Sequence, residues 1–202
     1  MTERQILFTP ENAQKCFEGR KTQTRRIVKF TDSGRVQRVG SYKNWHLDDP
    51  DAIHACPYGD VGDRLWVREA WAFPGEEAVM YQGNPDDVAL YRKWMEGENY
   101  PKIKWKPSIH MPRWACRTVL EITAIRVEQV QAISQADAIA EGIEYHDGHG
   151  IGHSGYRHTH SHGYVYANAV EAYKVLWESI NGTGSWAVNP WVWVITFKRV
   201  MR

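Results

Sequence analysis

The sequence predicts a single domain with an α+β fold, and three observations support this. The chain has 202 residues, enough to bury one hydrophobic core and still within the common range for one domain. Several segments alternate apolar and polar residues or are rich in aromatic and β-branched residues, as strands are. The segments with helical spacing are few and short, which favours a mixed fold over a helical bundle.

The first elements are a short strand and a helix. Gln5 to Phe8 is an apolar strand candidate. A helix is expected from Pro10 to Glu18, because Thr9 suits the N-cap and proline suits the first helical position. Gly19 can end this helix in a left-handed conformation.

The middle of the chain contains two strands separated by an insertion. Arg64 to Phe73 is rich in aromatic and β-favouring residues and predicts a strand. Residues 74–113 are expected to form the insertion, with a strand candidate at Ala78 to Tyr81 and a helix candidate around Asp87 to Met95. Cys116 to Val130 alternates with period two and is the clearest strand of the sequence.

A capped helix and a second insertion follow. Ser134 and Asp137 have the spacing of a capping box, and Gly142 is expected to end the short helix that they begin. Glu141 falls in the last turn of that helix. Residues 143–165 are expected to form the second insertion, a glycine- and histidine-rich loop without apolar periodicity.

The chain ends with a helix and a strand. Ala167 to Ile180 has apolar residues at helical spacing. Trp191 to Val200 is expected to be a strand with apolar residues on both faces. With these two elements, the sequence predicts more strands than helices.

Composition indicates the cellular compartment of the protein and the kind of charge pattern that could attract a ligand. The 25 basic and 24 acidic residues nearly balance, so attraction for phosphate requires local clustering of charge. The three cysteines contain no C-x-x-C pair, which favours reduced thiols in a cytosol. No apolar run is long enough to span a membrane. We therefore expect a cytoplasmic protein without a membrane association, and no obligate protein partner is evident.

The most specific feature is the basic segment Gly19 to Arg26, GRKTQTRR. It resembles the G-x-K-x-x-T-x-R signature of the ASCH domain, a PUA-like family. GDRLWVRE at residues 62–69 and PSIHMPRW at residues 107–114 resemble the long members that phages and prophages encode. The resemblance implies a small PUA-like β-barrel with flanking short helices and the two insertions described above.

The resemblance also implies an activity. Compact bacterial relatives in this family hydrolyse N4-acetylcytidine to cytidine and acetate with a lysine, a threonine and a glutamate. The signature places Lys21 and Thr24 in these roles, and position in the capped helix places Glu141 in the third. Glu69 and Glu144 are alternatives for the glutamate.

The residue types suit amide hydrolysis, which needs a nucleophile, a base and an acid for the departing amine. Thr24 can supply the nucleophile if a neutral neighbour accepts its proton. Nearby positive charges and burial would both favour the neutral form of Lys21, so this lysine is the candidate base. Glu141 can protonate the leaving nitrogen or position the substrate. The arginines that place positive charge near Lys21 are also candidate substrate-binding residues: Arg20, Arg25 and Arg26.

A second basic stretch, Lys102 to Arg117, combines positive charges with tryptophans and has no acidic residue. Charges that neutralise phosphates beside indoles that stack on bases are typical of a single-stranded RNA groove. The candidate binding residues are Lys104, Trp105, Arg113 and Trp114. The alternative is that the tryptophans are core residues and the lysines are solubilising.

The histidines of the second insertion suggest a metal site only weakly. They are His146, His149, His153, His158, His160 and His162. They lack a cysteine or carboxylate partner, and a glycine-rich loop is not preorganised. We therefore predict no metal site and no cofactor. The loop could instead act as a lid over the pocket.

Three functions remain open from the sequence. The first is an amidohydrolase acting on N4-acetylcytidine or a related N4-acylated cytosine nucleoside. The second is a single-stranded-RNA ribonuclease, in which Lys21, Arg25 and Arg26 stabilise charge on a phosphate. The third is a non-catalytic module that binds RNA or a modified base.

Overall fold

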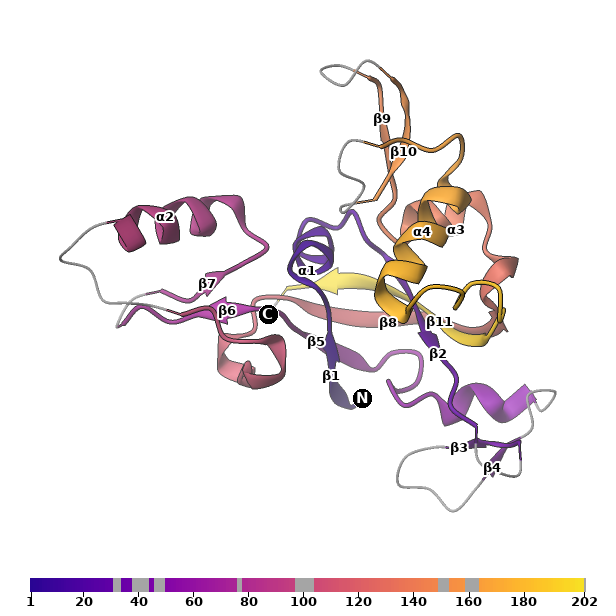
Figure 1. Cartoon of the computed structure of the whole chain (residues 1–202). Helices are drawn as coiled ribbons and strands as arrows, with labels where there is room; N and C mark the ends of the chain where they lie inside the picture. The colour runs from indigo at the N-terminus through magenta and orange to yellow at the C-terminus, as the bar shows by residue number, and fades with distance from the viewer. Residues whose placement is uncertain are drawn as a thin grey trace.

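The fold is built around a five-stranded sheet. This computed structural model describes residues 1–30, 34–37, 44–45, 50–75, 78–96, 104–148, 153–158 and 164–201. The strands of the sheet, in spatial order, are β1 (Glu3–Leu7), β5 (Arg64–Arg68), β8 (Val119–Gln129), β11 (Trp191–Val200) and β2 (Gln23–Ile27). β1 and β5 are parallel, and the other neighbours are antiparallel (Figure 1). The predicted α+β class is therefore confirmed.

Two helices lie where their capping signals predict them, and a third lies where helical spacing predicts it. They are α1 (Pro10–Phe17), α3 (Gln135–Ala140) and α4 (Ala169–Asn181). Thr9 Oγ1 accepts a hydrogen bond from the Asn12 amide and begins α1. Both hydrogen bonds of the capping box between Ser134 and Asp137 are present at the start of α3. Gly142 then takes a left-handed φ of 98°, which ends this helix.

Alternation along β11 divides the core into two layers. Trp193, Ile195 and Phe197 lie in one buried cluster, together with Ala13 and Cys16 of α1. The intervening residues Val192 and Val194 lie in a second cluster with residues of α3 and α4. The expectation that this strand is apolar on both faces is confirmed, because helices cover both sides of it.

The prediction of a closed barrel is wrong. In the described part of the chain the sheet is open, with β1 and β2 as its edges. A side-chain contact joins these edges in place of a backbone ladder: Arg26 Nη2 donates to the Leu7 carbonyl at 2.7 Å. The Arg26 guanidinium also lies 5.1 Å from the Phe8 ring centre. The link between the edges is thus one arginine side chain bonded to a backbone carbonyl, and no strand ladder joins β1 to β2.

Smaller elements extend from the sheet. Those in residues 71–115 are β6 (Trp71–Ala72), β7 (Met80–Tyr81), α2 (Pro85–Glu96) and two short 3-10 helices, Ser108–His110 and Arg113–Ala115. The others are β3 (Val36–Gln37), β4 (Asn44–Trp45) and the 3-10 helices Pro50–Ala55 and Val130–Ala132. Ala72 and Met80 form a small cluster of their own, with Trp105 packed against it.

The described part of the second predicted insertion contains two short strands. β9 (Glu144–His146) and β10 (Gly155–Arg157) form an antiparallel pair inside it. The sequence analysis missed these strands because each has three residues, too few for an alternation pattern to be recognised. Among the described residues, no helix combines the length and the apolar character needed to cross a membrane.

Candidate functional site

The turn between α1 and β2 directs Lys21 into the protein. Gly19 has a left-handed φ of 75° after the end of α1. The amides of Arg20 and Lys21 then both donate to the Lys15 carbonyl, at 2.9 and 3.2 Å. This tight reversal leaves Lys21 only 3% exposed, although it lies in a strongly basic segment.

The C-terminal end of α3 is fixed on this turn by three consecutive carbonyl groups. The Ala140 carbonyl accepts from the Thr22 amide at 2.9 Å. The carbonyls of Glu141 and Gly142 accept from the Nζ atoms of Lys21 and Lys15, at 2.7 and 2.6 Å. These hydrogen bonds fix the backbone at Glu141, and they therefore fix the point from which its side chain extends.

The carboxylate of Glu141 forms a buried ion pair with Lys21. Lys21 Nζ lies 2.6 Å from Glu141 Oε2, and both side chains are almost wholly buried. The other oxygen, Oε1, lies 3.3 Å from Arg25 Nη1 and 3.5 Å from the Tyr173 hydroxyl. Donors from two different segments therefore hold the carboxylate in one orientation.

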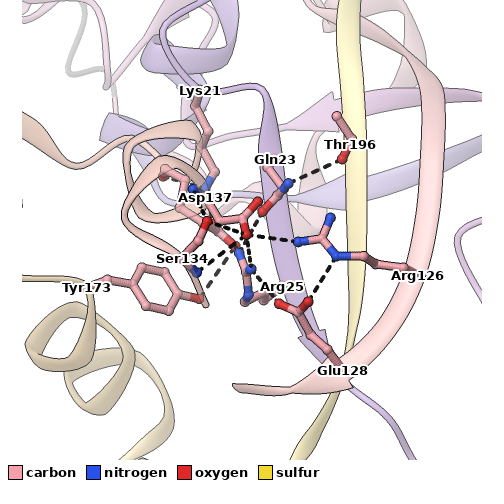
Figure 2. A network of polar contacts seen from close by, with 10 residues as sticks. Lys21, Gln23, Arg25, Arg126, Glu128, Ser134, Asp137, Tyr173 and Thr196 are labelled. Atoms are coloured by element: carbon pink, nitrogen blue, oxygen red, sulfur yellow. Dashed lines mark hydrogen bonds and ion pairs between the residues drawn. The ribbon is translucent and has the colours of Figure 1, made fainter. Parts of the chain in front are cut away.

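Arg25 lies at the centre of the polar network in Figure 2. Its guanidinium donates to Gln23 at 2.7 Å, to Glu128 at 2.6 Å and to Glu141 at 3.3 Å. The Arg25 side chain is 0% exposed. Arg126 extends the network toward the surface by contacting Glu128 at 2.9 Å. The expected substrate-binding role of Arg25 stays a prediction, and all of these guanidinium contacts are with protein groups.

Several groups around the pair have shifted pKa values. Burial, with the charges of Arg20 and Lys21, lowers the pKa of Lys15 to about 8. Burial, with the nearby charge of Glu141, raises the pKa of Tyr173 well above its usual value, so its hydroxyl remains a donor. Burial alone would raise the pKa of Asp137, but hydrogen bonds from Ser134 and others outweigh it and lower that pKa to about 2.

A cavity of about 640 Å³ lies along β2, on the side where a barrel would have closed. Lys21, Thr24 and Glu141 all line it. The sequence analysis selected these three residues, and the fold brings them to one cavity from separate parts of the chain. Four aromatic residues also line the cavity: Phe8, Tyr58, Tyr173 and Trp177.

Thr24 and Arg25 project from opposite faces of β2, because successive strand residues alternate. Thr24 pairs with Ile195, whose side chain lies in the cluster with Phe8. Arg25 pairs with Val194, which lies in the cluster beneath α4. Residues from both faces of β2 line the cavity, which therefore extends around the outer edge of this strand.

The remaining predicted residues of the signature differ in position. Arg26 lines the cavity, and it contacts Leu7 and Phe8 as described above. Arg20 has a side chain 47% exposed, contacts Glu18 and Glu144, and is not among the residues that line the cavity. The structure thus separates Arg20 from the other cations of the segment.

The second basic stretch does not gather its candidate residues at the cavity. Trp105 packs against Tyr91, with ring centres 4.7 Å apart. Arg113 pairs with Glu3 at 2.5 Å. Trp114 is 54% exposed, and Lys104 is exposed. Lys102 is outside the described residues. Two other residues of this stretch, Pro107 and Ser108, do line the cavity.

His149, His160 and His162 are outside the described residues. The histidines that are described are scattered. His158 is 3% exposed, and its ring is stacked 6.0 Å from that of Tyr166. Within the described ranges, no group of histidine, cysteine or acidic side chains is arranged to hold a metal ion. The lid role of this loop stays a prediction.

Sequence reasoning missed two residues of the site. Lys15 is a buried lysine of α1, and nothing in the sequence distinguishes it from an exposed one. Tyr173 belongs to the apolar stripe of α4, which the helical spacing identifies only as core-facing. Both become functional candidates because of the groups that other elements place beside them.

Comparisons with known proteins find a similarity in structure and none in sequence. No family model matches the sequence, and no curated protein matches it. The chain is similar to the crystal structure of an ASCH domain from Lactobacillus crispatus JV V101, with a TM-score of 0.43 and 11% sequence identity. That similarity covers all of this chain and 81% of the other.

Proposed function

We propose that this protein hydrolyses the amide of an N4-acylated cytosine nucleoside, with Thr24 as the nucleophile, Lys21 as the base and Glu141 as the acid. One observation carries the proposal: these residues line one cavity, with Lys21 Nζ 2.6 Å from Glu141 Oε2. The substrate class comes from the resemblance of residues 19–26 to the ASCH signature.

The ion pair suits this chemistry because its two members can share one proton. When the proton lies on Glu141, Lys21 is neutral and can accept the proton of Thr24 Oγ1 as the oxygen attacks the acyl carbon. Glu141 then donates its proton to the exocyclic nitrogen, the carbon–nitrogen bond breaks, and the free cytosine nucleoside leaves. This step leaves an acyl ester on Thr24, a lysine ammonium and a carboxylate.

Water completes the cycle. Its oxygen attacks the ester carbon while Glu141 accepts its proton, and Lys21 returns a proton to the departing Thr24 oxygen. The acid leaves, and the starting proton arrangement is restored. Lys21 Nζ bonds to Glu141, so in this mechanism its contact with the Thr24 hydroxyl forms when the substrate binds.

The cavity also suits a flat heterocycle. Phe8, Tyr58, Tyr173 and Trp177 give it aromatic walls, and bases stack on such side chains. Its volume of about 640 Å³ lies within the usual range for small-molecule sites.

The test is incubation of the purified protein with N4-acetylcytidine, followed by mass spectrometry. We expect cytidine and acetate in equal amounts from the wild type. Thr24→Val keeps the shape of the side chain and removes the hydroxyl, so it should abolish product. Thr22→Val is the matched control, because Thr22 is exposed and uses its backbone amide and carbonyl for its contacts.

Other outcomes would replace the proposal. Unchanged product formation by Thr24→Val would remove the covalent mechanism. Cleavage of single-stranded RNA in a parallel reaction, with N4-acetylcytidine left intact, would favour the ribonuclease. Salt-dependent binding of RNA without turnover of either substrate would favour the binding module.

A further inference from the structure

β2 is an edge strand, and its backbone groups divide into two sets. In an antiparallel ladder, alternate residues direct both their N–H and C=O groups at the partner strand, and the residues between them direct both groups away. The Val28 amide donates to the Trp191 carbonyl, and the Phe197 amide donates to the Thr22 carbonyl, both at 2.9 Å.

These two hydrogen bonds fix the set to which each residue belongs. Thr24 and Arg26 occupy the same alternating positions as Val28, so their backbone groups bond to β11. The backbone groups of Gln23, Arg25 and Ile27 point away from β11, toward the outer edge of the sheet.

Gln23 and Arg25 are the two largely buried members of the outer set, and of these two only Arg25 lines the cavity. The whole Arg25 residue is 5% exposed and its side chain 0%, so the exposed surface belongs to its backbone, and within the described ranges no hydrogen bond reaches its N–H or its C=O. Backbone donors and acceptors of largely buried residues nearly always have partners, in the protein or in a bound molecule, because leaving them without one is costly. A ligand that bonds to the strand edge would satisfy both groups.

The cavity runs along this same edge. It is lined by Thr24 and Arg26 from one face of β2 and by Arg25 from the other, with Ile27 further along. Rings lie on both sides of the strand: Phe8 packs on the face of Thr24, and Tyr173 on the face of Arg25. A flat ligand edge-on to the strand would thus meet hydrogen-bonding groups along its edge and apolar surface around it.

We infer that the backbone N–H and C=O of Arg25 bind the hydrogen-bonding edge of a nucleobase that presents an acceptor beside a donor. N4-acylated cytosine has this pattern, because the ring nitrogen N3 accepts and the neighbouring N4–H donates. This inference rests on the proposed function for the identity of the base. It places the acyl amide at the strand edge, between the Thr24 and Glu141 sides of the cavity.

The alternative occupant is an extended peptide that adds a strand to the sheet. Such binding needs an open edge along which several residues can pair. β2 has five residues, and residues from α4, Tyr58 and Ser108 also line the cavity beside it. A compact planar ligand suits this enclosed edge better.

The test is amide NMR on uniformly ¹⁵N-labelled Thr24→Val protein titrated with N4-acetylcytidine, so that turnover does not consume the ligand. We expect the amides of Arg25 and Ile27 to shift, and hydrogen exchange of the Arg25 amide to slow by about tenfold or more. The amides at position 24 and of Arg26 are internal controls, because β11 already bonds them and their exchange should change little.

A second experiment tests the hydrogen bond that the N4–H group of the base donates. N4,N4-dimethylcytidine lacks the N4–H group and should bind at least about tenfold more weakly than cytidine to the wild-type protein, whose fold is not in question. Equal affinity, or an unchanged Arg25 amide at saturating ligand, would overturn the inference. So would a response of these amides to peptides and not to nucleosides. If the wild type fails to hydrolyse N4-acetylcytidine while the Arg25 amide still responds, the reaction is wrong and the base-binding edge stands.

Discussion

Lys21 and Glu141 are 120 positions apart in the chain, and their charged atoms lie 2.6 Å apart. Their side chains are 2% and 4% exposed. In a buried pair the cost of desolvation offsets much of the attraction, but removing one partner leaves the other charge buried and uncompensated. Substitutions of Lys21 or Glu141 therefore test both the site and the stability of the fold.

Removing the charge of Glu141 should destabilise the protein strongly. We expect Glu141→Gln to lower the free energy of unfolding in urea by about 3–5 kcal/mol, because the Lys21 ammonium loses its carboxylate. Glu144→Gln is the control. Its side chain is 37% exposed and pairs with Lys15 and Arg20, so its loss should cost less than about 1 kcal/mol. Equal effects of the two variants would contradict this view of the pair.

Arg25 should act on catalysis by positioning Glu141. We expect Arg25→Lys to lower kcat for N4-acetylcytidine by roughly tenfold or more with little change in KM, because lysine cannot reproduce the several directed bonds of the guanidinium. Arg20→Lys should leave both constants unchanged, since Arg20 lies outside the cavity lining. A raised KM with an unchanged kcat would show instead that the Arg25 side chain itself binds the substrate.

Asp63 should stabilise the protein only above acidic pH. Burial would raise its pKa, but hydrogen bonds from Thr2 and the Asp60 amide outweigh it and lower the pKa to about 2. Its folded pKa is below the ordinary value of 3.8, so its contribution is present above that value and is lost as pH falls toward about 2. We expect Asp63→Asn to cost roughly 2 kcal/mol at pH 6 and much less at pH 2. Asp86→Asn, at an exposed position, should show no such pH dependence.

Lys15 should also make the stability of the protein rise with pH, but in the alkaline range. Its pKa is lowered from 10.5 to about 8, so between these values the unfolded chain binds more protons than the folded protein. The wild type should therefore gain roughly 2–3 kcal/mol relative to Lys15→Met as pH rises through this window. Urea unfolding at several pH values measures the difference. Lys198→Met, at a side chain 60% exposed, should give a constant difference.

The helices and most strands could be predicted because their signals are local. Thr9, Ser134 with Asp137, and Gly142 begin or end helices through bonds and dihedral angles within a few residues. The alternation in β11 likewise appears in a short window. The strands β9 and β10 were missed because three residues carry too little pattern.

The closure of the sheet could not be predicted in the same way. Whether β1 and β2 pair depends on what lies between them, here the contact of Arg26 with Leu7 and Phe8. Such a contact joins residues that are not neighbours in sequence, and no local pattern reports it. The resemblance to a barrel family supplied the expectation of closure, and the structure corrected it.

The sequence by itself determined which residues to consider at the site, since Lys21 and Thr24 stand in a recognisable basic signature and Glu141 ends a capped helix. Only the tertiary structure decided what surrounds them. It buried Arg25 among carboxylates, placed Lys15 beside the end of α3, and turned the outer edge of β2 into the wall of a cavity. The physical reason is that capping and alternation depend on near neighbours, whereas ion pairing and burial depend on which distant segments the packed core brings together.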